Sequence, residues 1–257
     1  MTKKIIISTL LLGSSLLFAE HSKADIKIAH NKHAHAVHWA YSGEGAPKNW
    51  GHIDPRFATC SNGVNQSPIN LTGFTESELP AITFNYHLTS SDILNNGHAI
   101  QANVKNGSSI TVDGKTFELK QFHFHNPSEN NINNKSFPLE AHFVHASKDG
   151  KLAVVAVMFE EGAENKALAE LWAKMPQNVG DKNPIDAKNL DALLPKDRDY
   201  YRFNGSLTTP PCTEGVRWLV MKKSVTLSAA QIETFKKVMH HQNNRPIQET
   251  NARVILK

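Results

Sequence analysis

Two short stretches of this chain, residues 121–125 (QFHFH) and 140–145 (EAHFVH), have the alternating pattern of β-strands. Successive side chains of a strand project to opposite faces, so His123 and His125 share one face of the first stretch. His142, in the second stretch, can complete a set of three imidazoles. Three such ligands with a fourth position open are typical of a catalytic zinc centre, whereas a structural centre uses four protein ligands. The sequence therefore predicts a strand pair that holds a catalytic metal.

Two acceptor residues support this interpretation. Gln121 precedes His123 by two positions on the same strand face, and Glu140 precedes His142 in the same way. A ligating imidazole usually donates its second N–H to a fixed acceptor, which sets its tautomer and orientation. Lone strand histidines are more often structural, but the paired acceptors favour a metal site. We expect His145, on the opposite face of its strand, to be structural.

The strand that carries the first two histidines should begin upstream of them. Strict alternation predicts one face made of Phe117, Leu119, Gln121, His123 and His125. The opposite face begins polar at Glu118 and Lys120 and becomes aromatic at Phe122 and Phe124. We therefore expect the histidine end of the strand to lie at the centre of a sheet, covered on both sides.

Turn signals divide the surrounding chain into antiparallel strands. Residues 113–114 (Asp-Gly) predict a type I′ hairpin, because both positions tolerate positive φ. Residues 149–150 (Asp-Gly) predict another hairpin. Residues 95–97 (Asn-Asn-Gly) and 106–107 (Asn-Gly) bracket a further strand, which we expect to carry His98.

Helices are expected late and in short segments. Apolar residues at helical spacing predict one helix over 163–175, and Ser228 followed by Gln231 forms a capping-box pattern that predicts the start of another. The apolar run 152–159 is typical of a central strand. The predicted fold is mainly β (α+β): a single domain with a large central, mostly antiparallel twisted sheet and short peripheral helices.

The first residues have the pattern of an export signal. Lys3 and Lys4 precede an apolar run at 5–18, and small residues end at Ala24, where we place the cleavage. A membrane anchor is the weaker alternative, because so short a run would not comfortably cross a bilayer. We expect a signal peptide at 1–24, a domain at 25–257 and a periplasmic or secreted location. Histidines in the mobile segment expected at 25–37 and just after it either bind metal loosely or are simply surface residues: His30, His33, His35 and His38.

Only two cysteines occur, Cys60 and Cys212. A cysteine pair in an exported chain usually forms a disulfide, so we predict one here, with two free buried thiols as the alternative. The formal net charge of +4 is small for 257 residues and gives no reason to expect a nucleic-acid partner.

In combination these motifs resemble one enzyme family. The motif residues are Gln66-Ser67-Pro68-Ile69, Asn95-Asn96-Gly97-His98, the two histidine stretches, and Gly205 through Cys212 with the sequence GSLTTPPC. They resemble α-class carbonic anhydrases of the secreted bacterial type, and the resemblance runs from about His38 to Arg253. It implies one Zn²⁺ per chain and reversible hydration of carbon dioxide to bicarbonate and a proton by zinc-bound hydroxide.

The resemblance also implies roles for individual residues. Thr208 would accept a hydrogen bond from the hydroxide and donate to Glu129, and His98 would be the proton shuttle. The backbone of Asn243 would support a ligand histidine. The substrate pocket would consist of Val144, Val154, Leu207, Thr208, Thr209, Val216 and Trp218. The water network would include Tyr41, Asn96 and Gln101.

Three residues depart from the family pattern. Asn130 follows Glu129 where relatives commonly have histidine, which puts the local loop structure in doubt. Asn244 stands where many animal relatives have tryptophan, and Gln101 replaces what is often asparagine.

Other functions stay open at this point. A binding protein of the same fold without turnover should lack a ligand. A zinc esterase or phosphatase is a second alternative, but a dedicated esterase would need further machinery that the sequence does not reveal. A zinc-binding role of the N-terminal histidines could coexist with catalysis. For the enzyme we expect carbon dioxide and bicarbonate as substrates, inhibition by sulfonamides and anions, no nucleic-acid partner and no membrane span after processing. A homodimer is a further expectation, because secreted bacterial relatives often form one.

Overall fold

The computed structural model describes residues 38–87, 91–105, 107–185 and 190–257. Residues 37–257 form one compact unit. The predicted signal peptide, the domain boundary after Ala24 and the histidines at 30, 33 and 35 lie outside the described residues, so those expectations remain predictions.

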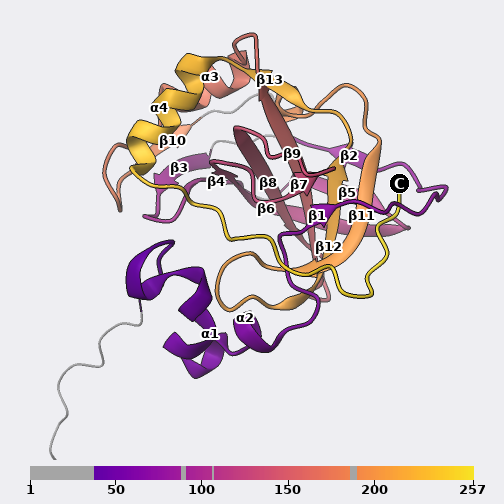
Figure 1. The fold of residues 1–257 in the computed structure, drawn as a ribbon. Coiled ribbons are helices and arrows are strands. Elements are labelled where there is room, and N and C mark those ends of the chain that lie inside the picture. The colour runs from indigo at the N-terminus through magenta and orange to yellow at the C-terminus, as the bar shows by residue number, and fades with distance from the viewer. Residues whose placement is uncertain (1–37, 88–90, 106, 186–189) are drawn as a thin grey trace, which may run out of the picture. The chain divides into compact units, whose positions relative to one another are not determined.

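Most of the strands belong to one large sheet (Figure 1). Its 11 strands include a path in the order β10-β3-β4-β6-β8-β9-β12-β11, while β5 pairs with β6, β2 with β5 and β13 with β9. Neighbours are antiparallel except where β12 and β13 pair with β9, and the separate β1–β7 pair is also parallel. The strands are β1 (Asn70–Leu71), β2 (Thr83–Asn85), β3 (Ser91–Asn95), β4 (Ile100–Asn103), β5 (Ser109–Val112), β6 (Lys115–His125), β7 (Asn131–Ile132), β8 (Leu139–Ala146), β9 (Leu152–Glu161), β10 (Lys182–Ile185), β11 (Tyr200–Ser206), β12 (Glu214–Met221) and β13 (Val225–Leu227). The predicted fold class is confirmed.

The helices are short, as predicted. Figure 1 shows α3 and α4 side by side, with α1 and α2 well apart from them. The α-helices are α1 (Trp50–Ile53), α2 (Thr59–Asn62), α3 (Lys166–Trp172) and α4 (Ala229–Met239). The 3-10 helices are Gly43–Gly45, Pro47–Asn49, Pro55–Phe57 and Leu190–Leu193.

The ends of the two longer helices follow from their caps. Helix α4 begins after Ser228, and the predicted capping box with Gln231 is present in both directions. Helix α3 is shorter than the predicted 163–175, because the side chain of Asn165 caps its start by accepting from the Leu168 N–H. Met175 is buried although it lies beyond the helix.

Each face of the sheet packs against its own apolar cluster. Strand β9 shows this most clearly, since Val155 and Val157 belong to the cluster that includes α3 and α4, whereas Val154 and Met158 belong to the cluster on the other face. Side chains of a strand alternate between faces, so a strand buried on both sides must be apolar throughout. This explains the continuous apolar run at 152–159.

The expected alternation along β6 is wrong in its first half. Leu119 pairs with His145 and Gln121 with Val144, so Lys120 is an extra residue in a β-bulge. The bulge reverses the parity of the strand. Phe117 and Leu119 consequently pack in the same cluster as Phe122 and Phe124, and not on the face of the histidines.

The turns are largely as predicted. Asp113 and Gly114 both have positive φ, 52° and 70°, at the hairpin between β5 and β6. His98 does not lie on the expected strand: it belongs to the bend that precedes β4. The side-chain oxygen of Asn96 accepts from the N–H groups of His98 and Ala99, which holds the chain in a turn at this point.

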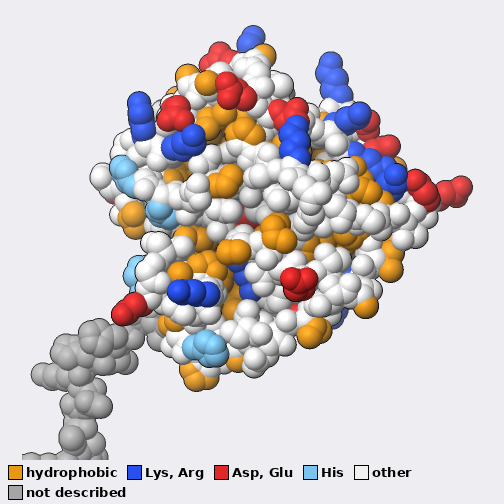
Figure 2. All heavy atoms as spheres, in the orientation of Figure 1, with side chains coloured by type: hydrophobic (Ala, Val, Ile, Leu, Met, Phe, Trp, Pro, Cys, Tyr) orange, Lys and Arg blue, Asp and Glu red, His pale blue; other side chains and the backbone are white. Residues whose placement is uncertain are grey.

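The surface carries charges of both signs. On the face in Figure 2, Lys and Arg side chains are interspersed with Asp and Glu side chains. In the part of the chain that the structure describes, none of the helices has both the length and the apolar character needed to cross a bilayer.

Candidate metal centre

Three histidines of β6 and β8 converge on the sheet face opposite the α3–α4 side. His123 and His142 are directly paired across the two antiparallel strands, and His125 follows on the same face of β6. One nitrogen from each of the three rings lies within 4.8 Å of the other two. His125 and His142 are buried and His123 is partly exposed, so the group is open on one side. It is the one histidine, cysteine and carboxylate cluster with metal-site geometry among the described residues.

The other nitrogens of the β6 histidines are held by acceptors. Nδ1 of His123 lies 2.8 Å from Oε1 of Gln121, and Nδ1 of His125 lies 2.6 Å from the carbonyl oxygen of Asn243. Both acceptors must receive a proton from the ring, so each Nδ1 is the protonated nitrogen. Nε2 of both rings is therefore left with a lone pair for a metal. The Asn243 side chain reinforces this position by accepting from the Asn126 N–H.

In His142 the two ring nitrogens have exchanged roles relative to the β6 histidines. Its Nε2 lies 2.9 Å from Oε1 of Glu140, although the two atoms are not aligned for a hydrogen bond. The acceptor on the Nε2 side leaves Nδ1 as the nitrogen that faces the other two rings. The predicted acceptors, Gln121 and Glu140, are therefore both next to the ligand histidines that they were expected to support.

The local environment keeps these rings neutral. Burial lowers the pKa of all three histidines, and the proximity of His125 lowers the pKa of His123 and His142 further. A neutral imidazole is the form that binds a metal. Nε2 of His125 and Oε2 of Glu129 are also buried without a hydrogen-bond partner in the described part of the chain. Buried polar atoms without partners are rare, and a cation at the three ring nitrogens would satisfy Nε2 of His125 and offset the charge of the nearby Glu129 carboxylate. The residues therefore fit a Zn²⁺ ion.

Comparisons with known proteins agree with this geometry. A family profile described as "Eukaryotic-type carbonic anhydrase" matches residues 45–257. A carbonic anhydrase of Pectobacterium atrosepticum is 48% identical over 222 residues, which cover 86% of this chain and 91% of that protein. The α-carbonic anhydrase of Thermovibrio ammonificans, solved with the inhibitor sulfanilamide, is 45% identical with a TM-score of 0.83, covering 86% of this chain and 99% of the other. That of Photobacterium profundum is 52% identical with a TM-score of 0.81, covering 86% and 100%.

The chain belongs to the α-class carbonic anhydrase family. These enzymes interconvert carbon dioxide and bicarbonate. The family relationship rests on most of the chain as well as on the histidines, because the family profile spans nearly all of the described residues.

Glu129 and Thr208, expected to act together in a carbonic anhydrase, are in contact. The Thr208 hydroxyl is hydrogen-bonded to the Glu129 carboxylate, and Oε1 of Glu129 also accepts from the Arg245 N–H at 2.8 Å. Oε2 of Glu129 lies 3.5 Å from Nε2 of His125. Complete burial raises the pKa of Glu129 to about 8. The carboxylate is thus fixed between the threonine and the three-histidine group.

The expected pocket wall is apolar and lies beside the histidines. Val154, Val216 and Trp218 belong to the buried cluster on this face, and Val144 and Leu207 pack against it. The Trp218 ring is 4.9 Å from the His142 ring. Thr209 lies in the same loop as Thr208, where its carbonyl oxygen accepts from the Cys212 N–H.

His98 is half-buried among aromatic rings. It stacks on Trp39 with ring centres 3.7 Å apart, and the His38 ring lies 5.6 Å away. Burial lowers the pKa of His98, and the charges of His38 and His241 lower it further. The segment that contains Trp39 therefore lies against His98, the expected proton shuttle.

The three residues of the expected water network have different surroundings. The Tyr41 hydroxyl is buried without a hydrogen-bond partner in the described residues, and burial followed by the charge of Glu129 raises its pKa. Gln101 pairs directly with His123 across β4 and β6. Its amide bonds to Asn96 on one side and to Asn103 on the other, so Asn96 and Gln101 are structural as well as close to the site.

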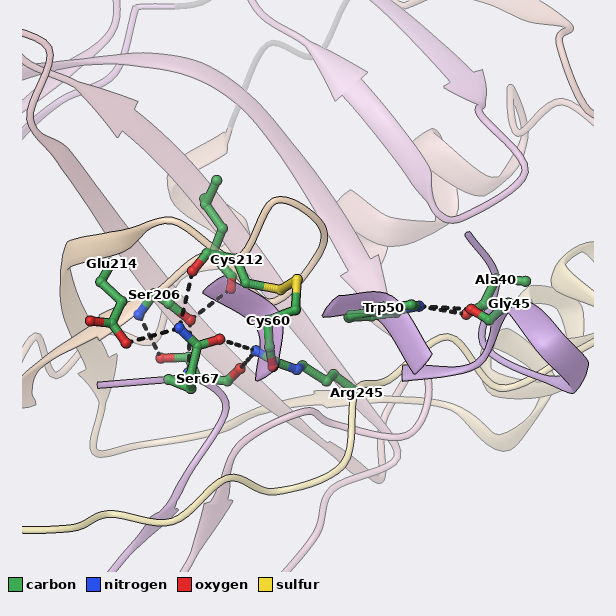
Figure 3. The surroundings of a disulfide bond; sticks show 11 residues. Ala40, Gly45, Trp50, Cys60, Ser67, Ser206, Cys212, Glu214 and Arg245 are labelled. Carbon is green, nitrogen blue, oxygen red and sulfur yellow. Dashed lines mark hydrogen bonds between the residues drawn. A yellow bond between two sulfur atoms is a disulfide. The ribbon is translucent and has the colours of Figure 1, made fainter. Parts of the chain in front are cut away.

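Cys60 and Cys212 form the predicted disulfide, which joins α2 to the threonine loop (Figure 3). Arg245 extends toward this bridge and donates through Nη2 to the Cys60 carbonyl and through Nη1 to Gln66 and Ser67. Its own backbone N–H holds Glu129. Arg245 thus connects the disulfide to the Glu129 carboxylate.

Sequence reasoning missed Arg245, Asn130 and the stacking role of Trp39. Asn130 had a signal, because it was recognised as a departure from the family pattern next to Glu129. The structure shows that it is completely buried and donates to Glu140. His145 was correctly expected to be structural, since its Nε2 is paired with the Tyr86 hydroxyl.

Proposed function

We propose that this chain is an exported zinc enzyme that hydrates carbon dioxide reversibly. The observation that supports this most strongly is the convergence of three ring nitrogens whose opposite nitrogens already have acceptors. Nε2 of His123, Nε2 of His125 and Nδ1 of His142 would hold one Zn²⁺. When bound to three neutral imidazoles, zinc lowers the pKa of a water ligand to about 7, as in carbonic anhydrase itself, and so supplies hydroxide at neutral pH.

Thr208 and Glu129 would control the direction of the attacking oxygen. Because the Thr208 hydroxyl donates its proton to the Glu129 carboxylate, the threonine oxygen can only accept a hydrogen bond from the nucleophile. A cation at the three nitrogens would favour the ionised carboxylate, which keeps this arrangement in place. The nucleophile's lone pair is then directed toward the substrate.

The apolar wall would bind carbon dioxide and exclude competing water. An uncharged substrate with weak hydrogen-bonding capacity gains from apolar surroundings, which Val144, Val154 and Trp218 offer next to His142. Leu207 and Val216 would complete the wall, and Thr209 would position bicarbonate.

His98 would carry the proton away from the site. Its lowered pKa keeps the imidazole neutral near neutral pH, so it can accept a proton and then release it to solvent. Its half-buried position at a bend favours exchange with both the cavity and the solvent. Tyr41, Asn96 and Gln101 would order the water molecules in between.

The remaining expectations extend this proposal. The leader at 1–24 would direct export and leave 25–257 as the mature enzyme in the periplasm or outside the cell. Sulfonamides and anions would inhibit by competing at the metal, as the sulfanilamide complex of the Thermovibrio ammonificans relative suggests. The mature chain would form a homodimer.

A metal assay combined with stopped-flow carbon dioxide hydration tests the proposal. The wild-type protein should contain one zinc per chain and turn over, with inhibition by sulfanilamide. His142→Ala should lose both zinc and turnover. His145→Gln is the matched control on the opposite face of the same strand, and it should keep its zinc. Wild-type turnover by His142→Ala would refute the assignment.

A further inference from the structure

The carboxylate of Glu140 connects two parts of the site. It is completely buried, and its Oε1 faces Nε2 of His142 at 2.9 Å. Its Oε2 accepts from the backbone N–H groups of Glu129 and Asn130 at 2.7 and 2.8 Å. Oε1 also accepts from the side-chain amide of Asn130 at 2.8 Å. Asn130 is thus the one side chain in the described structure that donates to the oxygen facing the ligand histidine.

The orientation of the Asn130 amide is determined by its other neighbour. Its Oδ1 accepts from the Ile69 N–H at 3.1 Å, and Asn130 is completely buried. A rotated amide would place its oxygen against a carboxylate oxygen and its NH₂ group against an N–H donor. Two like groups facing each other without water are unfavourable, so Nδ2 must point at Glu140.

This geometry gives the Asn130 side chain a specific effect. With its amide in place, Oε1 of Glu140 is held at a fixed point from which it can orient the His142 ring. Without the amide, only backbone donors to Oε2 would remain, and the carboxylate could rotate about them. A ligand whose supporting acceptor is free to move binds metal less tightly.

We propose that Asn130 is a positioning residue for the metal centre: through Glu140 it fixes the imidazole of His142 and slows the release of the metal. The inference rests on the proposed zinc function of the three histidines. Among the described residues Asn130 has no hydrogen bond to the three histidines, so it would act on them through Glu140.

The test is the rate at which zinc-loaded protein releases its metal to an excess of a chromogenic chelator. Asn130→Ala removes the amide, and Asn130→Leu removes it while keeping roughly the side-chain volume. Both variants retain the backbone donors of Glu129 and Asn130, so the measurement isolates the side chain. We expect release to become about 10-fold faster, the lower end of the 10–100-fold loss of metal affinity that follows removal of a direct partner of a metal ligand.

Ser128→Ala is the matched control. Ser128 is buried in the same loop, donates to the Asn130 carbonyl and accepts from the Phe137 N–H, but has no hydrogen bond to Glu140 in the described part of the chain. Loss of the Ser128 hydroxyl should lower the thermal stability of the metal-free protein about as much as the Asn130 substitutions do, without changing the rate of zinc release. Equal acceleration in Ser128→Ala would reduce Asn130 to a general loop-stabilising residue and overturn the proposal.

Two further readouts separate positioning from stability. In cobalt-substituted protein, the visible absorption bands should shift in the Asn130 variants and not in Ser128→Ala. Asn130→His restores an N–H donor and should recover part of the slow release. Release by folded Asn130→Leu within twofold of wild type would overturn the inference while leaving the zinc function intact. Failure of the wild-type protein to bind zinc would overturn both.

Discussion

The disulfide between Cys60 and Cys212 should make a large contribution to stability. It links residues 152 positions apart and so closes a loop that spans most of the domain. The loop-closure expression for such a length gives about 5 kcal/mol, and measured values for disulfides commonly fall at about 2–4 kcal/mol. We expect the variant Cys60→Ala/Cys212→Ala to lose about 3–5 kcal/mol of unfolding free energy. For a domain of this size that corresponds to a melting temperature lower by roughly 6–20 °C.

The assay is urea unfolding in the presence of EDTA, because bound zinc would add its own stabilisation to the folded state. Wild-type protein unfolded with reductant is the comparison that retains both sulfur atoms. The difference between reduced wild type and the double variant then measures the loss of packing, since Cys212 is completely buried and Cys60 nearly so. A loss below about 1 kcal/mol in both samples would refute the loop-closure reasoning.

Three other perturbations address the chemistry of the site. His98→Ala should lower turnover about 100-fold in weak buffer, which is the lower end of the effect of a positioned proton-transfer group. Added imidazole should restore part of the lost turnover. No response to imidazole would show that His98 is not the proton shuttle. Thr208→Val should lower kcat about 100-fold or more, with zinc content unchanged in a metal assay, because it removes a fixed polar contact to the nucleophile. In metal-free protein, burial raises the pKa of Glu129 from 4.5 to about 8, so the folded state keeps a proton on Glu129 that the unfolded state loses above pH 4.5. The contribution of this proton to the unfolding free energy is therefore complete below pH 4.5 and is lost as the pH rises through 8. Glu129→Gln should therefore flatten the fall in urea-unfolding free energy between pH 5 and 8, and an unchanged slope would contradict this assignment.

Much of the site was predictable because strand parity is a strong constraint. The spacing of His123 and His125, together with acceptors two positions before His123 and His142, depends only on which face each side chain takes. The register of β6 against β8 then brings the third ring to the first two. Local rules were also sufficient for the Asp113-Gly114 hairpin and the Ser228 cap, since each depends on a few neighbouring residues.

Prediction failed where distant parts of the chain decide the outcome. The bulge at Lys120 has no local signature and exists because both halves of β6 must present apolar residues to the same cluster. The role of Asn130 depends on Ile69 and Glu140, which tertiary folding brings together. Likewise, Arg245 meets Cys60 and Glu129 only in the folded chain, and the sequence around Arg245 gives no sign of either contact.

The bulge at Lys120 determines where strand β6 can be shortened, because Lys120 has no partner residue on β8. It separates the part of β6 that forms the hairpin with β5 from the part that carries the histidines. Shortening the hairpin by one residue in each strand leaves the metal ligands on their face, because their alternation is counted from the bulge onward. Deleting Lys120 would remove the bulge and keep both sets of side chains on their faces, because Leu119 and Gln121 already pair with consecutive residues of β8. The hairpin and Lys120 are therefore the places where β6 can be shortened while the metal ligands keep their face of the sheet.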